Sequence, residues 1–253
     1  MSTQRLSVDK ALLQRGLCDT IEQAHDLIRS GVVRVNGSIV FTLNRQIASH
    51  DDVLVRHADQ FVSRGGLKLE AALAEFGIEV VDKRVLDAGA STGGFSDCVL
   101  QRGAREVVAV DVGKSQLHER IASDTRVVVI DSFNVRRLSE PDLPIELDRD
   151  FDLVVADLSF ISLRSVAHCL IAKLDRSGDL IVLVKPQFEA TKQEVDKGQG
   201  VITDQRIRDR VLAEVGVAMH DLGLSEQGRT ESPIRGAEGN IEYLVWYRFE
   251  ACT

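Results

Sequence analysis

Five short apolar segments in the chain each end in a single charged residue. The segments are Val85–Leu86 before Asp87, Val107–Val110 before Asp111, Val127–Ile130 before Asp131, Leu153–Ala156 before Asp157 and Leu180–Val184 before Lys185. Short runs rich in β-branched residues, separated by helical stretches, are typical of parallel strands in a layered α/β sheet. A charge is costly inside such a sheet, so each terminal charge should lie at the carboxyl end of its strand. Those ends share one edge, where open α/β sheets usually bind ligands.

The stretches around these segments have their own periodicity. The predicted helices cover residues 67–76, 94–102, 114–122, 161–174 and about 204–221, and predicted antiparallel edge strands cover about 224–232 and 241–249. Together with the five apolar segments, they predict a Rossmann-like α/β domain with a mostly parallel sheet and an antiparallel C-terminal edge.

The beginning of the chain has a different pattern. Thr20 and Gln23 have capping-box spacing, and apolar residues then recur at helical intervals. Residues 32–35 and 39–41 are strand-like and flank Asn36-Gly37, a strong signal for a two-residue hairpin. The pattern predicts a compact unit of helix and hairpin.

The chain therefore divides into two predicted domains. Residues 1–55 are predicted as a small α+β domain, residues 56–65 as a linker without clear periodicity, and residues 66–253 as the α/β domain. The formal net charge of −8 argues against a simple basic clamp for nucleic acid. Residues 1–68 carry a net charge of +2, however, which makes the N-terminal part the better candidate for a surface that faces a polyanion.

Composition excludes several classes of protein. With 44% apolar and 28% charged residues, the chain can bury an ordinary globular core, and its apolar runs are far too short to span a bilayer. Residues 1–20 contain no secretory signal, so we expect a soluble, cytoplasmic protein without a membrane partner. The four cysteines, Cys18, Cys98, Cys169 and Cys252, are far apart and form no CxxC pair, so we expect isolated buried thiols and no metal.

The first strand of the predicted sheet runs into a glycine-rich loop, Asp87-Ala88-Gly89-Ala90-Ser91-Thr92-Gly93-Gly94-Phe95. Glycines let the turn tighten and let a ligand approach the backbone, and exposed amides at the start of a helix favour an anion. Asp111 follows Asp87 by 24 residues, at the end of the next strand, where a carboxylate can accept both hydroxyls of a ribose. The pattern indicates a nucleoside-binding βαβ unit, although a plain strand-to-helix turn would use the same glycines.

Spacing narrows the choice of nucleoside. Ser91 stands where the GxGxxG pattern needs a glycine, which disfavours a dinucleotide, and Val108 stands where a phosphate-binding P-loop needs its first glycine, which disfavours ATP. The acid at Asp87 suits a ligand with a cationic end, such as S-adenosylmethionine (SAM). The expected cofactor-binding residues are Asp87, Gly89, Ala90, Ser91, Thr92, Gly93, Gly94, Phe95, Asp111, Asp131, Asn134 and Asp157. Asp131 and Asn134 are expected near the adenine ring, with turn formation as the alternative.

Five motifs, in order along nearly the whole chain, resemble the TlyA family. They are Ser63-Arg64-Gly65-Gly66-Leu67-Lys68-Leu69, Asp87 to Phe95, Ala156-Asp157-Leu158-Ser159-Phe160-Ile161-Ser162, Val184-Lys185-Pro186-Gln187-Phe188-Glu189 and Gly239-Asn240-Ile241-Glu242-Tyr243. That family comprises ribosomal RNA 2′-O-methyltransferases historically labelled hemolysins, and its catalytic half is similar to FtsJ-type methyltransferases. Its front end resembles a small RNA-binding domain first described in a ribosomal protein, which residues 24–37 match here.

The resemblance implies an activity and a catalytic set. The implied catalytic residues are Lys68, Asp157, Lys185 and Glu242. The implied reaction is methylation of cytidine ribose in small- and large-subunit ribosomal RNA, with SAM as the donor. The chain departs from the family pattern at Ile21-Glu22, where a Ser-Arg pair is usual and a phosphate contact is lost, and at Thr191, where a glycine is usual.

The residues themselves support roles for two members of this set. Lys185 ends a fully apolar strand, and a lysine near a ribose hydroxyl can accept its proton or stabilise the developing oxyanion as a cation. Asp157 would orient Lys185 and the methionine end of SAM. The alternatives are a lysine that reaches solvent from a strand end and an aspartate that caps a helix. The roles of Lys68 and Glu242 rest mainly on the resemblance.

Isolated basic residues near the motifs are candidates for contacts with RNA phosphates, although such side chains are usually just solvated. These candidates are Arg64, Lys192, Lys197 and Arg235. Phe160 is expected to be an ordinary core residue rather than a cover over the methyl-donor pocket.

Three functions compete at this point. The first is a SAM-dependent ribosomal RNA 2′-O-methyltransferase that acts on ribosomal RNA or ribosomal subunits. The second is a non-catalytic RNA-binding or ribosome-assembly factor with the same fold, against which the retention of Asp157 and Lys185 argues. The third is a membrane-active hemolysin, which no signal, spanning segment or basic amphipathic stretch supports.

Overall fold

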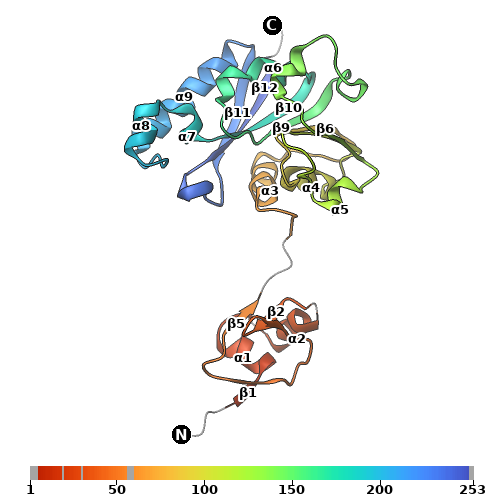
Figure 1. The fold of residues 1–253 in the computed structure, drawn as a ribbon, viewed down its shortest axis with the longest axis vertical. Coiled ribbons are helices and arrows are strands. Elements are labelled where there is room, and N and C mark those ends of the chain that lie inside the picture. The colour runs from red at the N-terminus through yellow and green to blue at the C-terminus, as the bar shows by residue number, and fades with distance from the viewer. Residues whose placement is uncertain (1–4, 19, 30, 56–59, 251–253) are drawn as a thin grey trace. The chain divides into compact units, whose positions relative to one another are not determined.

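The chain divides into two compact units, Met1–Gln60 and Phe61–Thr253. The computed structural model describes residues 5–18, 20–29, 31–55 and 60–250, and Figure 1 draws them as ribbons. Each unit has an apolar core of its own. None of the helices in these ranges is long and apolar enough to cross a membrane.

The first unit combines two helices with short antiparallel strands. Its elements are β1 (Arg5–Ser7), α1 (Val8–Gln14), α2 (Ile21–Arg29), β2 (Val33–Val35), β3 (Ser38–Ile39), β4 (Gln46–Ala48) and β5 (Val53–Val55). The predicted hairpin is confirmed: β2 pairs with β3, and Asn36 and Gly37 between them have φ values of 51° and 80°. The Gln23 amide donates to the Thr20 hydroxyl and so caps α2.

The second unit is a sheet of seven strands with helices on both sides (Figure 1). Its strands are β6 (Arg84–Ala88), β7 (Glu106–Val110), β8 (Val127–Ile130), β9 (Phe151–Ala156), β10 (Leu174–Val184), β11 (Leu224–Glu231) and β12 (Tyr243–Phe249). Its α-helices are α3 (Gly65–Phe76), α4 (Gly94–Gln101), α5 (Glu119–Ala122), α6 (Ala167–Ile171), α7 (Pro186–Glu189), α8 (Lys192–Lys197) and α9 (Gln205–His220). Its 3₁₀ helices are η1 (Val135–Ser139), η2 (Ile145–Leu147), η3 (Leu163–Ser165) and η4 (Ala237–Gly239).

The order of the strands shows which part of the sheet lies next to the predicted ligand site. The order is β11-β12-β10-β9-β6-β7-β8, and the pairs among β6 to β10 are parallel. β12 is antiparallel to both of its neighbours, so it alone runs against the other strands of this sheet. The chain moves outward from β6 to β8 and then returns to β9 on the other side of β6. Open α/β sheets bind ligands at such a switch point.

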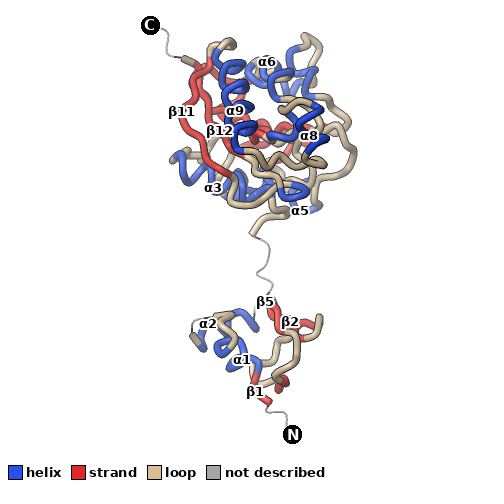
Figure 2. The backbone as a smooth tube through the Cα atoms, turned by 90° about the vertical axis from the view of Figure 1, so that its left-hand side faces the viewer, coloured by secondary structure: helices blue, strands red, loops and turns tan. Residues whose placement is uncertain are grey.

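Alternate residues of the strands pack on opposite faces of the sheet, as expected from their period of two. Leu86, Val154 and Val182 belong to the core beneath α6 and α9. Val85 and Val155 belong to the core beneath α3 and α4. Figure 2 shows α9 alongside the edge formed by β11 and β12. Because helices cover both faces of the sheet, a ligand can reach it only at the ends of the strands.

The predicted helix over residues 114–122 is wrong for most of its length, because only α5 forms there. Ser115 has a φ of 53°, and its amide donates to the Asp131 carboxylate at 2.8 Å. Because the Asp131 carboxylate accepts the Ser115 amide, the loop after β7 forms a turn at Ser115 instead of a helix. The helix therefore starts later, at Glu119.

The predicted helix over residues 161–174 is also wrong in part. It is divided into η3 and α6, and β10 already begins at Leu174. The amide of Leu163 donates to the side chain of Glu189 at 2.5 Å. This hydrogen bond to a residue far away in the sequence fixes the turn at the start of η3.

The described part of the predicted linker packs against the second unit. Phe61 is 2% exposed within the core beneath α3, and the Val62 amide donates to the Asp97 carboxylate at 2.7 Å. Residues 56–59 lie outside the described residues. Of the cysteines, Cys98 and Cys169 are buried and Cys18 is partly buried. Cys252 lies beyond the last described residue.

Candidate active site

The glycine-rich loop is held against the ends of two neighbouring strands. The Gly89 amide donates to the Val110 carbonyl at 2.9 Å, and the Asp157 amide donates to the Ala88 carbonyl at 3.1 Å. Gly89 has a φ of 86°, and a Cβ there would lie 2.6 Å from the Asp157 carbonyl oxygen. Only glycine fits this position, because both the conformation and the space exclude a side chain.

Asp111, at the end of β7, fixes the loop from the other side. Its Oδ2 accepts the Ser91 amide at 2.8 Å, and its Oδ1 accepts the Gly113 amide at 2.7 Å. A carboxylate has about four lone-pair sites, so both oxygens can still accept hydroxyl groups. The half-buried Asp111 therefore keeps the capacity to bind a ribose.

Asp87 is fully buried at the end of β6. The Ser96 hydroxyl donates to Oδ2 at 2.6 Å, whereas Oδ1 has no hydrogen-bond partner within the described structure. Burial raises the pKa of Asp87 to about 7; the Ser96 hydrogen bond opposes the rise, and the charges of Asp157 and Asp111 add to it. A buried carboxyl with one unsatisfied oxygen is a place where a cationic donor is favoured.

Two cavities meet at the glycine-rich loop. The first, of about 280 Å³, is lined by Ser63, Arg64, Gly65, Lys68, Gly89, Ala90, Ser91, Thr92, Gly94, Phe95, Asp157, Ser159, Lys185, Ile234, Arg235 and Gly236. The second, of about 450 Å³, is lined by Gly89, Ser91, Asp111, Val112, Gln116, Asn134, Val135, Arg136, Asp157, Leu158, Ser159, Phe160 and Ile161. The residues common to both are Gly89, Ser91, Asp157 and Ser159. The second cavity has the apolar walls that a nucleoside needs, and the first has most of the charged groups.

Lys185 and Asp157 form an ion pair in the first cavity. Lys185 Nζ lies 2.5 Å from Asp157 Oδ1 and donates to the Ser159 hydroxyl at 2.9 Å. The lysine is 8% exposed, and its ammonium lies 5.7 Å from the centre of the Phe188 ring. The carboxylate, the Ser159 hydroxyl and the Phe188 ring hold the side chain of Lys185 in one place at the wall of the first cavity.

Lys68 and Glu242 form a second ion pair, with 2.6 Å between Nζ and Oε2. The Glu242 side chain is 2% exposed, and Gly236 lies so close that a Cβ there would be 2.1 Å from Glu242 Oε1. Gln187 Nε2 approaches the same Oε1 at 3.4 Å. Lys68 lines the first cavity, so Glu242 fixes it from behind.

We expect Glu242→Gln to lower the free energy of unfolding by about 3–5 kcal/mol, because it leaves the Lys68 charge buried without the carboxylate that pairs with it. The double variant Lys68→Met/Glu242→Gln should recover most of this loss. Urea denaturation at pH 7 measures both.

The control for this prediction is Glu140→Gln, which breaks the exposed pair between Arg137 and Glu140. It should change stability by less than about 0.5 kcal/mol. An equal loss in the Glu140 and Glu242 variants would contradict the assignment of a buried, coupled pair at Glu242.

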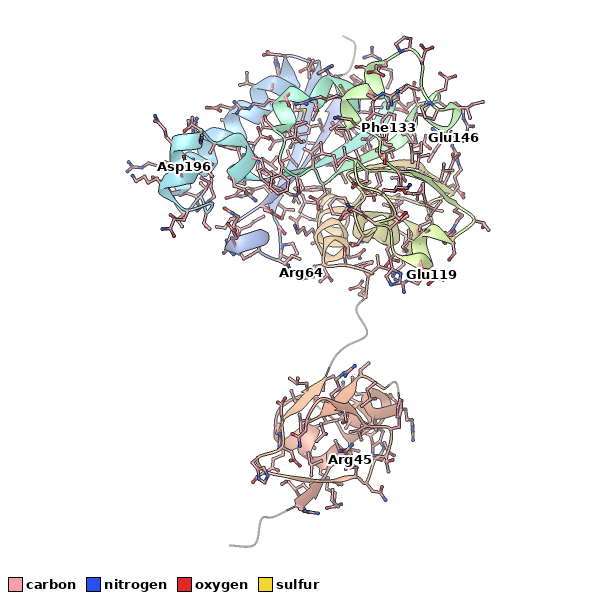
Figure 3. All side chains as sticks on the ribbon, viewed as in Figure 1. Arg45, Arg64, Glu119, Phe133, Glu146 and Asp196 are labelled. Carbon is pink, nitrogen blue, oxygen red and sulfur yellow. The ribbon has the colours of Figure 1, made fainter. Side chains whose placement is uncertain are left out.

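The structure brings most of the predicted site residues together. Those that line a cavity are Arg64, Lys68, Gly89, Ala90, Ser91, Thr92, Gly94, Phe95, Asp111, Asn134, Asp157, Lys185 and Arg235. Asp87 and Glu242 are buried directly behind them. Figure 3 places Arg64 at the start of α3.

Four other predicted residues line neither cavity. Gly93 has a φ of 92°, and a Cβ there would meet Leu117, so it serves the packing of the loop. Asp131 accepts the Ser115 amide and lines neither cavity. Lys192 and Lys197 are exposed on α8, outside both cavities.

The expectation that Phe160 is a core residue is wrong. Its side chain is 92% exposed at the second cavity, its φ is 62°, and its ring lies 5.2 Å from that of Phe188. A bulky residue in this conformation is rare, and such outliers occur mainly at functional sites. Sequence reasoning also missed Ser159 as the hydrogen-bond partner of Lys185. Its position two residues after Asp157 was the available signal.

The chain is similar to known methyltransferases and to a known RNA-binding domain. Residues 61–249 match the family described as FtsJ-like methyltransferase, and residues 7–53 match the S4 domain. Over 247 residues, the chain is 42% identical to "16S/23S rRNA (cytidine-2′-O)-methyltransferase TlyA" of Mycobacterium tuberculosis, an alignment that covers 97% of this chain and 90% of that protein.

The chain belongs to the TlyA family. TlyA-family relatives also carry the name hemolysin: "Hemolysin A" of Brachyspira hyodysenteriae is 40% identical over 242 residues, 96% of this chain and 99% of that one. A solved structure from Streptococcus thermophilus, also named as a hemolysin, superposes with a TM-score of 0.72 at 36% identity. It covers 98% of this chain and 90% of its own. In the described part of this TlyA-family chain, no group of three or more His, Cys, Asp or Glu side chains could hold a metal ion.

Proposed function

We propose that this TlyA-family chain transfers the methyl group of SAM to the 2′-hydroxyl of cytidine ribose in ribosomal RNA. The observation that carries the proposal is the placement of two lysines, Lys185 and Lys68, each paired with a carboxylate, in a cavity that shares four lining residues with the cavity beside Asp111. The names of the M. tuberculosis relative and of the FtsJ-like family support the same reaction.

The residues present fit SAM. The Oδ1 of Asp87, which has no partner in the described structure, would accept a hydrogen bond from the ammonium at the methionine end of SAM. Asp111 would accept hydrogen bonds from the ribose hydroxyls of the cofactor. Leu158 and Ile161 give the second cavity an apolar wall for adenine. Bound in this way, SAM supplies an activated methyl group on a sulfonium centre.

Lys185 has the central chemical role. The 2′-oxygen gains negative charge as its proton leaves to solvent, and a fixed ammonium within hydrogen-bond distance stabilises that charge. The ion pair with Asp157 holds Lys185 in place, so we assign Lys185 as this cation. The electron pair left on the 2′-oxygen would then take the methyl group that bound SAM supplies, with the sulfur of the donor as the leaving group. Lys68, fixed by Glu242, lies at the same cavity to orient the ribose.

The RNA would be bound by both units. The S4 match in residues 7–53 supports RNA binding by the first unit, and the exposed Arg64 and Arg235 lie at the first cavity of the second. Lys192 and Lys197 on α8 would contact phosphates farther from the reacting ribose. A ribosomal substrate would place the protein in the cytoplasm.

The decisive test is transfer of labelled methyl from SAM to ribosomal subunits that lack the modification, followed by mapping of the labelled nucleotide. We expect label on the 2′-oxygen of a cytidine. Label on a base, or RNA binding without any transfer, would contradict the proposal; the second result would indicate the non-catalytic ribosome-assembly factor instead.

The affinity for S-adenosylhomocysteine should rise about tenfold between pH 6 and pH 8. The pKa of Asp87 is about 7, so its carboxyl is mostly neutral at pH 6 and mostly charged at pH 8, and the charged form attracts the ligand ammonium. Calorimetric titration over this range measures the change, and Asp87→Asn should abolish it while weakening binding. If the affinity of the wild-type protein did not change with pH, Asp87 would not bind the ammonium of the ligand.

The same carboxyl makes the ligand-free chain less stable as pH rises. In the folded state the pKa of Asp87 lies well above the value for an unfolded chain, so the folded state holds the extra proton between about pH 4 and pH 7. The contribution of this group to stability is therefore present below that window and is lost as pH rises through 7.

A further inference from the structure

Two short segments carry the ion pair at the centre of the site. Residues 157–162 leave β9, and residues 185–189 leave β10. The contact of 2.5 Å between Asp157 and Lys185 joins the two segments at their beginnings. Farther along, the rings of Phe160 and Phe188 lie 5.2 Å apart and join them again.

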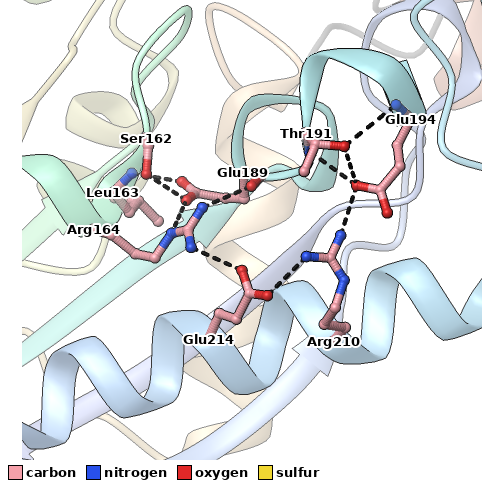
Figure 4. Close-up of polar contacts among 8 residues, drawn as sticks. All are labelled: Ser162, Leu163, Arg164, Glu189, Thr191, Glu194, Arg210 and Glu214. Atoms are coloured by element: carbon pink, nitrogen blue, oxygen red, sulfur yellow. Dashed lines mark hydrogen bonds and ion pairs between the residues drawn. The ribbon is translucent and has the colours of Figure 1, made fainter. Parts of the chain in front are cut away.

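The side chain of Glu189 joins the same segments at their far ends. It is 2% exposed and accepts the Ser162 hydroxyl at 2.6 Å and the Leu163 amide at 2.5 Å. Arg164 donates to the Glu189 carboxylate at 3.2 Å and to its backbone carbonyl at 2.8 Å. Figure 4 shows these contacts around Glu189. A buried carboxylate with several donors is a strong and directional link.

The two segments therefore form a closed ring. Asp157 cannot move away from Lys185 unless the segment to Ser162 changes shape, and Glu189 holds the end of that segment. Phe160, with its unusual φ of 62°, lies between the two fixed points. A residue in such a conformation persists only where its surroundings enforce it. The carboxylate of Glu189 is a fixed point at the end of this segment.

A second group of charged residues connects Arg164 to α9 outside the ring. Arg164 donates to Glu214 at 2.8 Å, and Arg210 donates to Glu214 at 2.8 Å and to Glu194 at 2.6 Å. Glu194 closes the capping box of α8. This group contacts Arg164 but neither Ser162 nor Leu163, so it offers a control for Glu189 (Figure 4).

We infer that Glu189 is a positioning residue for methyl transfer: it sets the geometry of the Asp157–Lys185 pair by holding the segment after β9 against α7. The inference rests on the proposed function. Glu189 lines neither cavity, so its effect on the reaction passes through the ring alone.

The test compares Glu189→Gln with Glu214→Gln in the full-length protein. The glutamine keeps the shape of Glu189 but presents an amide to Arg164 and weakens the link to Ser162. We expect kcat for methyl transfer to fall about thirtyfold, because small displacements of reacting groups carry large kinetic costs. The KM for ribosomal subunits and the affinity for S-adenosylhomocysteine should stay within about threefold, since few of their contacts change. Glu214→Gln should leave kcat within about twofold.

Three results would overturn the inference. They are a kcat of Glu189→Gln within threefold of wild type, an equal fall of kcat in both variants, and a crystal structure of Glu189→Gln in which Asp157 and Lys185 keep their ion pair and Phe160 keeps its position. The crystal structure decides even if the wild-type protein transfers no methyl, so failure of the proposed function is recognised separately. If Glu189→Gln does not fold, Ser162→Ala removes one link of the ring and should lower kcat about fivefold.

Discussion

Replacing Lys185 with alanine should lower kcat for methyl transfer about a thousandfold, because it removes the cation that pairs with Asp157 and that we propose to lie at the reacting oxygen. Binding of S-adenosylhomocysteine should change little, since Asp87 and Asp111 remain. Single-turnover transfer of labelled methyl to ribosomal subunits measures the rate, and calorimetry measures the binding.

Two variants make this result interpretable. Lys114→Ala removes the same charge from an exposed position outside both cavities and should keep the wild-type rate. Lys185→Arg keeps a cation that cannot act as a base, because a guanidinium stays protonated in proteins. A rate for arginine at least tenfold above that for alanine supports the cation role. Equal rates for the two would point to proton abstraction by Lys185.

Replacing Gly89 with alanine should weaken the binding of S-adenosylhomocysteine by about a hundredfold or more. The φ of 86° is unfavourable for alanine, and its Cβ would lie 2.6 Å from the Asp157 carbonyl, so the loop must move away from β9. Both cavities include Gly89, so the movement changes the shape of each. Calorimetric titration measures the loss of affinity.

Gly77 provides a matched control for this substitution. It has a φ of 65° at the end of α3, and a Cβ there would meet nothing within 4 Å. Gly77→Ala should cost about 1 kcal/mol of stability through the backbone conformation alone and leave ligand binding unchanged. If Gly89→Ala behaved like Gly77→Ala, the close approach of loop and strand would not matter for the ligand.

The strand ends were predictable from sequence because the rule behind them is local. An apolar run followed by one charge can satisfy burial and solvation only if the charge lies at the edge of the sheet. Asp87, Asp111, Asp157 and Lys185 meet this condition, and the structure brings them around one loop. Asp131 meets the same condition but turns to the Ser115 amide, because β8 lies at the edge of the sheet, away from the switch point.

The parts that sequence reasoning missed depend on contacts between distant segments. No residue near Leu163 in the sequence indicates that its amide donates to Glu189. Yet this contact lies where the helix predicted over residues 161–174 is divided. Phe160 was expected in the core because an ordinary core residue is the simpler interpretation of a phenylalanine, whereas the turn after Asp157, with a φ of 62° at Phe160, leaves its side chain 92% exposed. The α8 helix was predictable in principle, since Thr191 and Glu194 have capping-box spacing, and Thr191 makes that cap where a glycine could not.

The reversed direction of β12 has a consequence for how the enzyme matures. Because β12 runs against its neighbours, it begins at the edge where the others end, and so it delivers Glu242 to Lys68. It is also inserted between β10 and β11, which come earlier in the chain. Until the ribosome has made β12, the edges of β10 and β11 that it joins stay unpaired and Lys68 lacks its partner Glu242, so activity should arise only after β12 has been synthesised.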